Sequence, residues 1–138
     1  MTHSFPRGLP SFYIRVYKIV DDPSLDPIIS WSKSNNSFIV WNVEEFCRVI
    51  SPKSVGLGRS ISRFFCDLRY HGFKRINGRP GRLEFGHDDF VRGQPQLLKK
   101  MMVKTWTERM EKNKAKKARA KARKARVKVE HLLQNLQI

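Results

Sequence analysis

The apolar positions of this chain alternate between helical and strand-like spacing. A first helix is predicted from apolar residues that recur every three or four positions: Phe12, Val16, Ile19 and Val20. Asp21-Asp22-Pro23 are predicted to end this helix. Two β-rich segments, 28–31 and 37–41, follow this helix, and the polar, turn-like residues 32–36 connect them. The pattern therefore predicts a β-hairpin after the first helix.

A second helix is predicted from residue 42 to about residue 50, because Asn42 followed by Glu45 has the spacing of a capping box. Cys47 lies at helical spacing within it and is expected to pack in the core. Two short strands joined by a tight turn are predicted at 73–76 and 82–85. A short helical segment is predicted within 88–102.

The segment 61–71 has the clearest amphipathic pattern in the chain. Its apolar residues fall on one face of a helix: Ile61, Phe64, Phe65 and Leu68. The opposite face and its flank carry basic and hydrogen-bonding side chains: Arg59, Ser62, Arg63, Cys66, Arg69 and Tyr70. Such an outer face suits a DNA major groove. Gly72 is predicted to end the helix, because glycine tolerates the left-handed cap conformation.

The predicted order is helix, two strands, helix, helix, two strands. Two successive helices followed by a β-hairpin are typical of a winged helix-turn-helix. We therefore predict an α+β fold, with a three-helix bundle, a small four-stranded antiparallel sheet and a basic C-terminal tail that is helical or disordered. The predicted boundaries are a disordered leader at 1–10, a winged-helix domain at 11–102 and the tail at 103–138.

The charge of the chain indicates a polyanionic partner. The 138 residues include 28 Lys and Arg against 12 Asp and Glu, for a net charge of +16. Both the predicted domain and its tail are basic, and nucleic acid is the commonest partner of such a surface. The alternative is that the charge only keeps the protein soluble.

The tail carries a run of cations, 112–128, that is interleaved with alanine and free of Asp, Glu, Gly and Pro. The ten cations are Lys112, Lys114, Lys116, Lys117, Arg119, Lys121, Arg123, Lys124, Arg126 and Lys128. Such a run is typical of a nuclear localisation signal, a nucleic-acid arm or both, and the alternative is a solvated helix without a partner. The short apolar stripe that follows, at 129–136, spans too few heptads to predict a coiled coil.

The remaining residues argue against several other classes. Cys47 and Cys66 are far apart and the four histidines lack metal-ligand spacing, so we expect no metal, cofactor or disulfide scaffold. We find no nucleophile–base set or phosphate loop, so we expect neither an enzyme nor a small-molecule substrate. We expect no membrane span and no signal peptide. Trp31 and Trp41 are expected to pack in the core.

Four ordered blocks resemble the DNA-binding domain of heat-shock transcription factors, particularly the plant type. They are Ile29-Ser30-Trp31, Ser37-Phe38-Ile39-Val40-Trp41, Gly72-Phe73-Lys74 and Phe90-Val91-Arg92-Gly93-Gln94, and the resemblance extends over residues 12–101. The resemblance implies a nuclear, winged-helix regulator of transcription in the stress response that binds double-stranded DNA at inverted GAA-type repeats. The resemblance also implies that other heat-shock factors can be protein partners.

The helix that reads DNA in that family departs here from the family's pattern. The position of the family's guanine-reading arginine is Cys66, which cannot make a bidentate bond to guanine. Arg63, one turn earlier, is the candidate replacement; the alternative is that it contacts phosphate or pairs with Asp67. Cys66 itself is interpreted as an ordinary surface thiol rather than an activated one.

Three more cations, Arg69, Lys74 and Arg75, are predicted to contact phosphate, and Tyr70 to contact the DNA backbone or cover the helix end. The family's long heptad region and activation segment do not follow the domain, so we interpret the chain as a truncated, diverged relative. The predicted function is sequence-specific DNA binding of altered or weakened specificity. The alternatives are non-specific DNA, RNA or chromatin binding, and a protein-interaction remnant that does not bind DNA.

Overall fold

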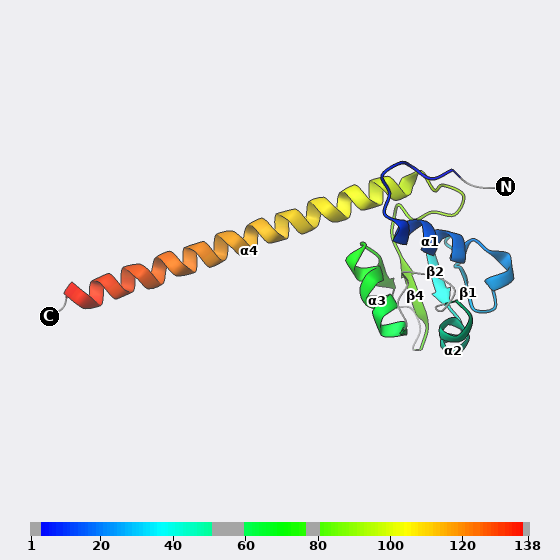
Figure 1. Ribbon diagram of the computed structural model, residues 1–138, viewed down its shortest axis with the longest axis horizontal. Helices are drawn as coiled ribbons and strands as arrows, with labels where there is room; N and C mark the ends of the chain where they lie inside the picture. Colours follow the sequence, from blue (N-terminus) through cyan, green and yellow to red (C-terminus); the bar gives the residue numbers. More distant parts are fainter. Residues whose placement is uncertain (1–3, 51–59, 77–80, 137–138) are drawn as a thin grey trace. The chain divides into compact units, whose positions relative to one another are not determined.

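The computed structural model describes residues 4–50, 60–76 and 81–136 (Figure 1). The chain divides into two compact units, Met1–Val103 and Lys104–Ile138. The first unit contains the predicted winged-helix elements. The second is the greater part of one long helix.

The first helix, α1 (Ser11–Val20), forms as its apolar spacing predicts. Its inward face buries aromatic and aliphatic side chains, and Asp21 follows it as the C-cap. A short 3-10 turn, η1 (Pro23–Leu25), is capped by Asp22, whose carboxylate accepts from the Ser24 backbone N–H at 3.0 Å. The acidic and proline residues after Val20 therefore end the helix, as predicted.

Four short strands form one antiparallel sheet, as predicted. They are β1 (Ile29–Trp31), β2 (Ser37–Val40), β3 (Lys74–Ile76) and β4 (Leu83–Gly86), in the order β1-β2-β4-β3. Phe38 on β2 lies opposite Phe85 on β4, which in turn lies opposite Arg75 on β3. Gly86 is required where β4 meets β2, because an added Cβ would lie 2.6 Å from the Asn36 carbonyl oxygen.

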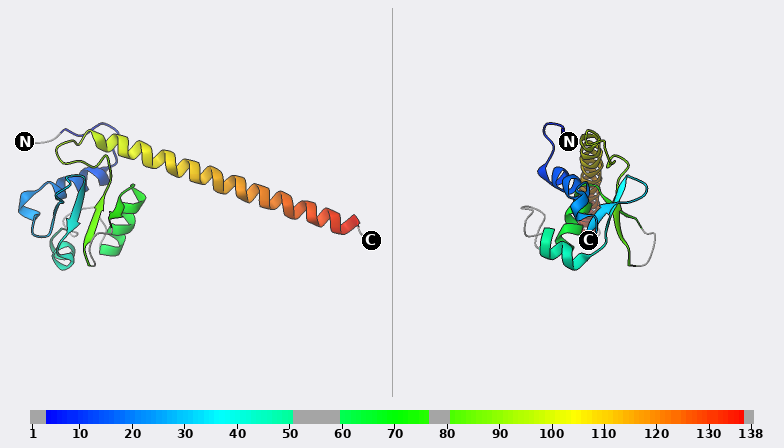
Figure 2. Two further views of the ribbon diagram at one scale, coloured as in Figure 1. Left: turned by 180° about the vertical axis from the view of Figure 1, so that it is seen from behind. Right: turned by 90° about the vertical axis from the view of Figure 1, so that its right-hand side faces the viewer.

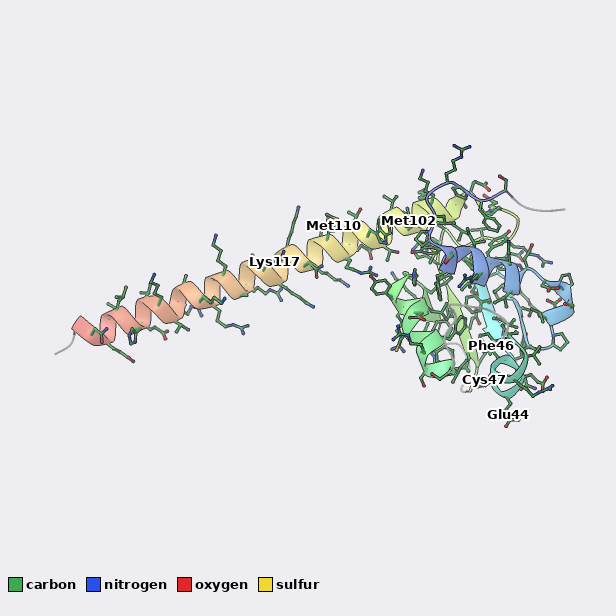
Figure 3. The ribbon with its side chains drawn as sticks, in the orientation of Figure 1. Glu44, Phe46, Cys47, Met102, Met110 and Lys117 are labelled. Atoms are coloured by element: carbon green, nitrogen blue, oxygen red, sulfur yellow. The ribbon has the colours of Figure 1, made fainter. Side chains whose placement is uncertain are left out.

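The second helical segment begins as α2 (Val43–Glu45) and continues as η2 (Phe46–Ile50), which is wound as a π-helix. The Asn42 side chain accepts from the Glu45 backbone N–H at 3.0 Å, as the sequence predicts. The Glu45 carboxylate accepts two hydrogen bonds from Arg48, at 2.7 and 3.0 Å, and these hydrogen bonds lower the pKa of Glu45. Cys47 packs against the core from this segment (Figure 3).

The core lies between the helices and one face of the sheet. Phe90 is fully buried at its centre, with ring centroids 4.9 Å from Trp31 and from Phe73 and 5.8 Å from Phe38. The Tyr17 hydroxyl accepts from the Gly93 backbone N–H at 2.9 Å, and burial raises the pKa of this tyrosine. Aromatic rings are therefore prominent among the buried residues of this small domain.

The prediction for Trp41 is wrong. Trp31 does pack on the core, but 55% of Trp41 is exposed. Because successive side chains of a strand alternate between faces, and Val40 points into the core, Trp41 points to the open face of the sheet. There its indole N–H donates to the Ser30 hydroxyl at 2.8 Å, and the Arg82 guanidinium lies 5.6 Å from its ring centroid.

Residues before α1 also differ from the predicted disordered leader. The Phe5 ring packs edge-on against Tyr17 at a centroid distance of 5.6 Å, and Leu9 packs against the core. These two apolar side chains lie in a polar, proline-containing segment, which by itself shows no periodic pattern. Their packing depends on surfaces that only the folded domain presents.

The last helix, α4 (Leu97–Leu136), is far longer than the short segment predicted within 88–102. Its first turns belong to the first unit, where Leu98, Met101 and Met102 are buried. No glycine or proline interrupts the chain after Gln96, so nothing in the sequence stops the helix. The basic tail is therefore helical. None of the helices in the described part of the chain is long and apolar enough to cross a membrane.

Candidate DNA-binding surface

The helix with the basic outer face is α3 (Ile61–Tyr70). The Ser60 side chain caps its first turn by accepting from the Arg63 backbone N–H at 3.1 Å. Phe64 and Leu68 are buried, whereas Ile61 and Phe65 are partly buried, so the predicted apolar face is confirmed. This face fixes the orientation of the helix, which lies beside β4 (Figure 1 and the left view of Figure 2).

The C-terminal end of α3 is closed by a Schellman motif. Gly72 has φ of 99°, its N–H bonds to the Arg69 carbonyl at 3.1 Å, and the Phe73 N–H bonds to the Leu68 carbonyl at 3.0 Å. Phe73 and Leu68 are both buried in the same core cluster, which suits the apolar positions of this motif. Gly72 therefore ends the helix by the mechanism that the sequence predicts.

His71 attaches this end of α3 to α1. Its ring stacks on Phe12 with a centroid distance of 4.1 Å, and its Nδ1 lies 2.7 Å from the Asp67 carbonyl oxygen. The Tyr13 hydroxyl donates to the His71 carbonyl at 2.8 Å. These contacts fix the end of α3, and the sequence gives no signal for them because α1 lies far away in the chain.

The outer face of α3 presents the predicted side chains together. Ser62, Arg63, Cys66, Arg69 and Tyr70 are all exposed, the last by 59%. At 100° per residue, Cys66 and Tyr70 lie near the middle of this face, with Arg63 on one flank and Arg69 on the other. Arg59 lies outside the described residues.

Arg63 makes an ion pair with Asp67 one turn later. The Nε of Arg63 lies 3.4 Å from a carboxylate oxygen of Asp67, and the two side chains are 70% and 21% exposed. Such an exposed i,i+4 pair is weak, typically about 0.3–0.5 kcal/mol. Arg63 is therefore held by an interaction that a base or a phosphate can replace.

The register of the sheet separates Lys74 from Arg75. Arg75 lies opposite the buried Phe85, against which Phe65 of α3 packs, so Arg75 lies on the helix side of the sheet. Lys74 is one residue earlier and therefore lies on the open side. Both are exposed on β3, an edge strand. Only Arg75 thus shares a face of the sheet with α3.

The ten cations predicted in the tail all lie on α4, and every residue from Lys112 to Lys128 is exposed. Within the described ranges there is no group of three or more His, Cys, Asp or Glu that could hold a metal ion. The surfaces that the structure assembles are therefore cationic and helical, and phosphate oxygens are the ligands that suit them.

Helix α3 is short, basic and capped, and it packs on a four-stranded sheet. A match to a known family identifies the kind of domain that has this arrangement. Residues 12–104 match the family model described as HSF-type DNA-binding. This chain belongs to the HSF-type DNA-binding family. The family is one of DNA-binding transcription factors and not of enzymes.

Relatives of this HSF-type domain confirm its family and its fold. It is 47% identical to heat stress transcription factor A-4a of Arabidopsis thaliana over 92 residues, which cover 67% of this chain and 22% of that relative. The chain thus spans about a fifth of the length of that relative. It is also similar to Skn7 of Chaetomium thermophilum with SSRE DNA, with a TM-score of 0.62, 25% identity and coverage of 67% of this chain and 97% of that one.

A heat shock transcription factor/DNA complex matches the HSF-type domain with a TM-score of 0.51 and 27% identity, covering 59% of this chain and 98% of that one. The α+β winged-helix fold with a four-stranded antiparallel sheet is therefore confirmed. Two features of the structure could not be predicted from the sequence: the anchoring of α3 by His71, and the exposure of Trp41 on the face of the sheet opposite Val40.

Proposed function

We propose that this HSF-type domain binds double-stranded DNA in a sequence-specific manner, with the outer face of α3 in the major groove. The observation that carries the proposal is the exposed row of Arg63, Cys66, Arg69 and Tyr70 on a helix held at both ends. A helix fixed in this way presents its side chains to base edges in one register. One solved relative is Skn7 with SSRE DNA and another is a heat shock transcription factor/DNA complex, which supports a DNA partner for this chain.

Arg63 is the residue that we propose reads a base. It lies three residues before Cys66 on the same exposed surface, and its partner Asp67 holds it only weakly. A bidentate arginine–guanine contact contributes about 1–3 kcal/mol of discrimination between bases. Arg69, Lys74 and Arg75 are proposed to contact phosphate, which sets register without reading sequence.

The proposed setting is the nucleus, where the protein regulates transcription. The cations of 112–128 have the composition of a nuclear localisation signal, and the relatives are transcription factors. Inverted GAA-type repeats are the proposed target, and other heat-shock factors are proposed partners on neighbouring repeats.

The test is a titration of the full chain on a duplex of inverted GAA repeats and on a scrambled duplex of equal length, at several salt concentrations. We expect the parent to prefer the repeats, and Arg63→Ala to weaken binding to the repeats by roughly 5- to 150-fold, with a smaller loss on the scrambled duplex. The matched control is Arg48→Ala, which removes an exposed arginine that also pairs with an acid in its own helical segment.

A second candidate function, non-specific DNA binding, is favoured by Cys66 at the centre of the outer face. If the repeats and the scrambled duplex bind equally, and the affinity falls steeply with salt, then phosphate contacts alone carry the binding. If Arg63→Ala weakens both duplexes equally, Arg63 contacts phosphate and does not read a base.

A further inference from the structure

The cations of α4 between residues 112 and 128 fall into two rows along the helix. One row, here the arginine ridge, contains Lys112, Lys116, Arg119, Arg123 and Arg126. The other, the lysine ridge, contains Lys114, Lys117, Lys121, Lys124 and Lys128. Members of each ridge are three or four residues apart, which places them on one side of an α-helix. All three arginines of the run lie on one ridge.

Small side chains separate the ridges on one side of the helix. This alanine stripe contains Ala115, Ala118, Ala122 and Ala125. At 100° per residue, each ridge lies about 100° from the stripe, one on either side. All of these residues are exposed, and the side chains project outward around this part of α4, where Lys117 is labelled (Figure 3). The helix therefore presents a flat alanine stripe between the two cationic ridges.

Repulsion between like charges destabilises the unbound helix in this segment. Four pairs of like charges stand at i,i+4, namely Lys112 with Lys116, Lys117 with Lys121, Arg119 with Arg123, and Lys124 with Lys128. Such pairs destabilise a helix. The residues from 112 to 128 include no acid that could offset them. A polyanion that lies along both ridges removes the repulsion.

Charge also decides between possible occupants of the alanine stripe. In a parallel pair of copies that meet along the stripe, positions of the arginine ridge face positions of the lysine ridge, so cation meets cation. Alanine offers too little apolar area to hold the helix in a membrane surface. A partner with two rows of negative charge on either side of an open channel fits both ridges, and the DNA major groove has this form.

We propose that residues 112–128 of α4 form a second duplex-binding element, which lies in a major groove with the alanine stripe toward its floor and the two ridges against the phosphates of the two strands. The major groove, about 12 Å wide, admits an α-helix. The segment is about 25 Å long, which corresponds to roughly seven base pairs. The proposal rests on the proposed function, because it extends the contact of the same chain to neighbouring DNA.

The test compares the full chain and its variants on two duplexes, by fluorescence anisotropy over a series of salt concentrations. The short duplex carries only the inverted GAA repeats, and the long one adds about ten base pairs of unrelated sequence on each side. One variant replaces the five cations of the arginine ridge with glutamine, and another does so for the lysine ridge. Glutamine preserves helix propensity while it removes charge.

We expect each ridge variant to bind the long duplex at least tenfold more weakly and to lower the slope of log K against log salt by up to about 4. Binding to the short duplex should change by less than about threefold, because the groove beyond the repeats is missing. An unchanged slope and affinity on the long duplex for both variants would overturn the proposal.

A composition-preserving variant tests the ridges themselves. This variant exchanges Lys117 with Ala118, Lys121 with Ala122, and Lys124 with Ala125. The exchange keeps the net charge, but it removes three lysines from the lysine ridge and places them in the alanine stripe. We expect this variant to lose slope and affinity on the long duplex as the lysine-ridge variant does. If it binds like the parent, charge alone carries the contact and the placement in the groove is wrong.

Two further results separate the alternatives. Double-stranded RNA of the same length has a major groove too narrow for a helix, so equal ridge-dependent binding to RNA would overturn the groove placement. A failure of the proposed function gives a different result from a failure of this proposal. In that case the chain does not bind the short duplex, and Arg63→Ala has no effect on that duplex. Ridge-dependent binding to the long duplex can survive that loss, and Arg63→Ala on the short duplex reports on the domain alone.

Discussion

Asp67 limits what the outer face of α3 can bind. Its carboxylate lies 3.4 Å from the Arg63 guanidinium and on the same helix as Arg69. A carboxylate beside this surface repels phosphate and competes for the arginine. We expect Asp67→Asn to strengthen binding to DNA, because it removes the negative charge and releases Arg63.

The magnitude follows from the geometry of this pair. Releasing Arg63 from an exposed i,i+4 pair contributes about 0.3–0.5 kcal/mol, because both partners are in contact with solvent. Removing a carboxylate about 4–5 Å from a phosphate contributes about 1 kcal/mol at the dielectric constant of water. Together these terms correspond to about a tenfold gain in affinity. The unfolding temperature should fall by no more than about 3 °C.

The assay is the same anisotropy titration on the duplex of inverted GAA repeats, at one low and one physiological salt concentration. The matched control is Glu44→Gln, which makes the same change of charge on α2, an element outside the proposed surface. An equal gain in both variants would mean that net charge alone is responsible. No gain in Asp67→Asn would refute the placement of α3 against the DNA.

Three further predictions concern the scaffold that holds α3. Phe90→Ala should lower the free energy of unfolding by about 3–5 kcal/mol in urea titration, because Phe90 is fully buried among aromatic rings; unfolding at the parent's urea midpoint would contradict this. Gly72→Ala should cost about 1–2 kcal/mol in thermal unfolding, because φ is 99°, and Gly72→Asn should cost less. Burial raises the pKa of Tyr17 in the folded state, so its contribution to stability is complete below the unfolded pKa near 10.0 and is lost as pH rises above it. Tyr17→Phe should flatten this alkaline loss in unfolding followed by circular dichroism, and an unchanged pH profile would assign the loss to another group.

Helix α3 shows how far local sequence can specify structure. The spacing of Ile61, Phe64, Phe65 and Leu68 predicted the buried face of α3, and Gly72 predicted its end, because both depend on interactions within a few residues. The anchoring of α3 through His71 could not be predicted, because Phe12 and Tyr13 lie about sixty residues earlier in the chain.

The hairpin and the tail show the same division. β-rich composition predicted β1 and β2, but it gave no sign that Trp41, just beyond the last paired residue, would point to the face of the sheet opposite Val40. The composition of the tail predicted helix formation but left its extent open. The absence of Gly and Pro after Gln96 is what allows α4 to continue from the core into the cationic run.

The sequence by itself determined the elements, their order, the family of the fold and the concentration of positive charge on two helices, because these depend on periodicity, caps and composition. Only the tertiary structure decided which side of the sheet Arg75 and Lys74 occupy, and that Trp41 is exposed. Those outcomes depend on strand register and on packing between residues distant in the chain. Such contacts form only when the whole core closes.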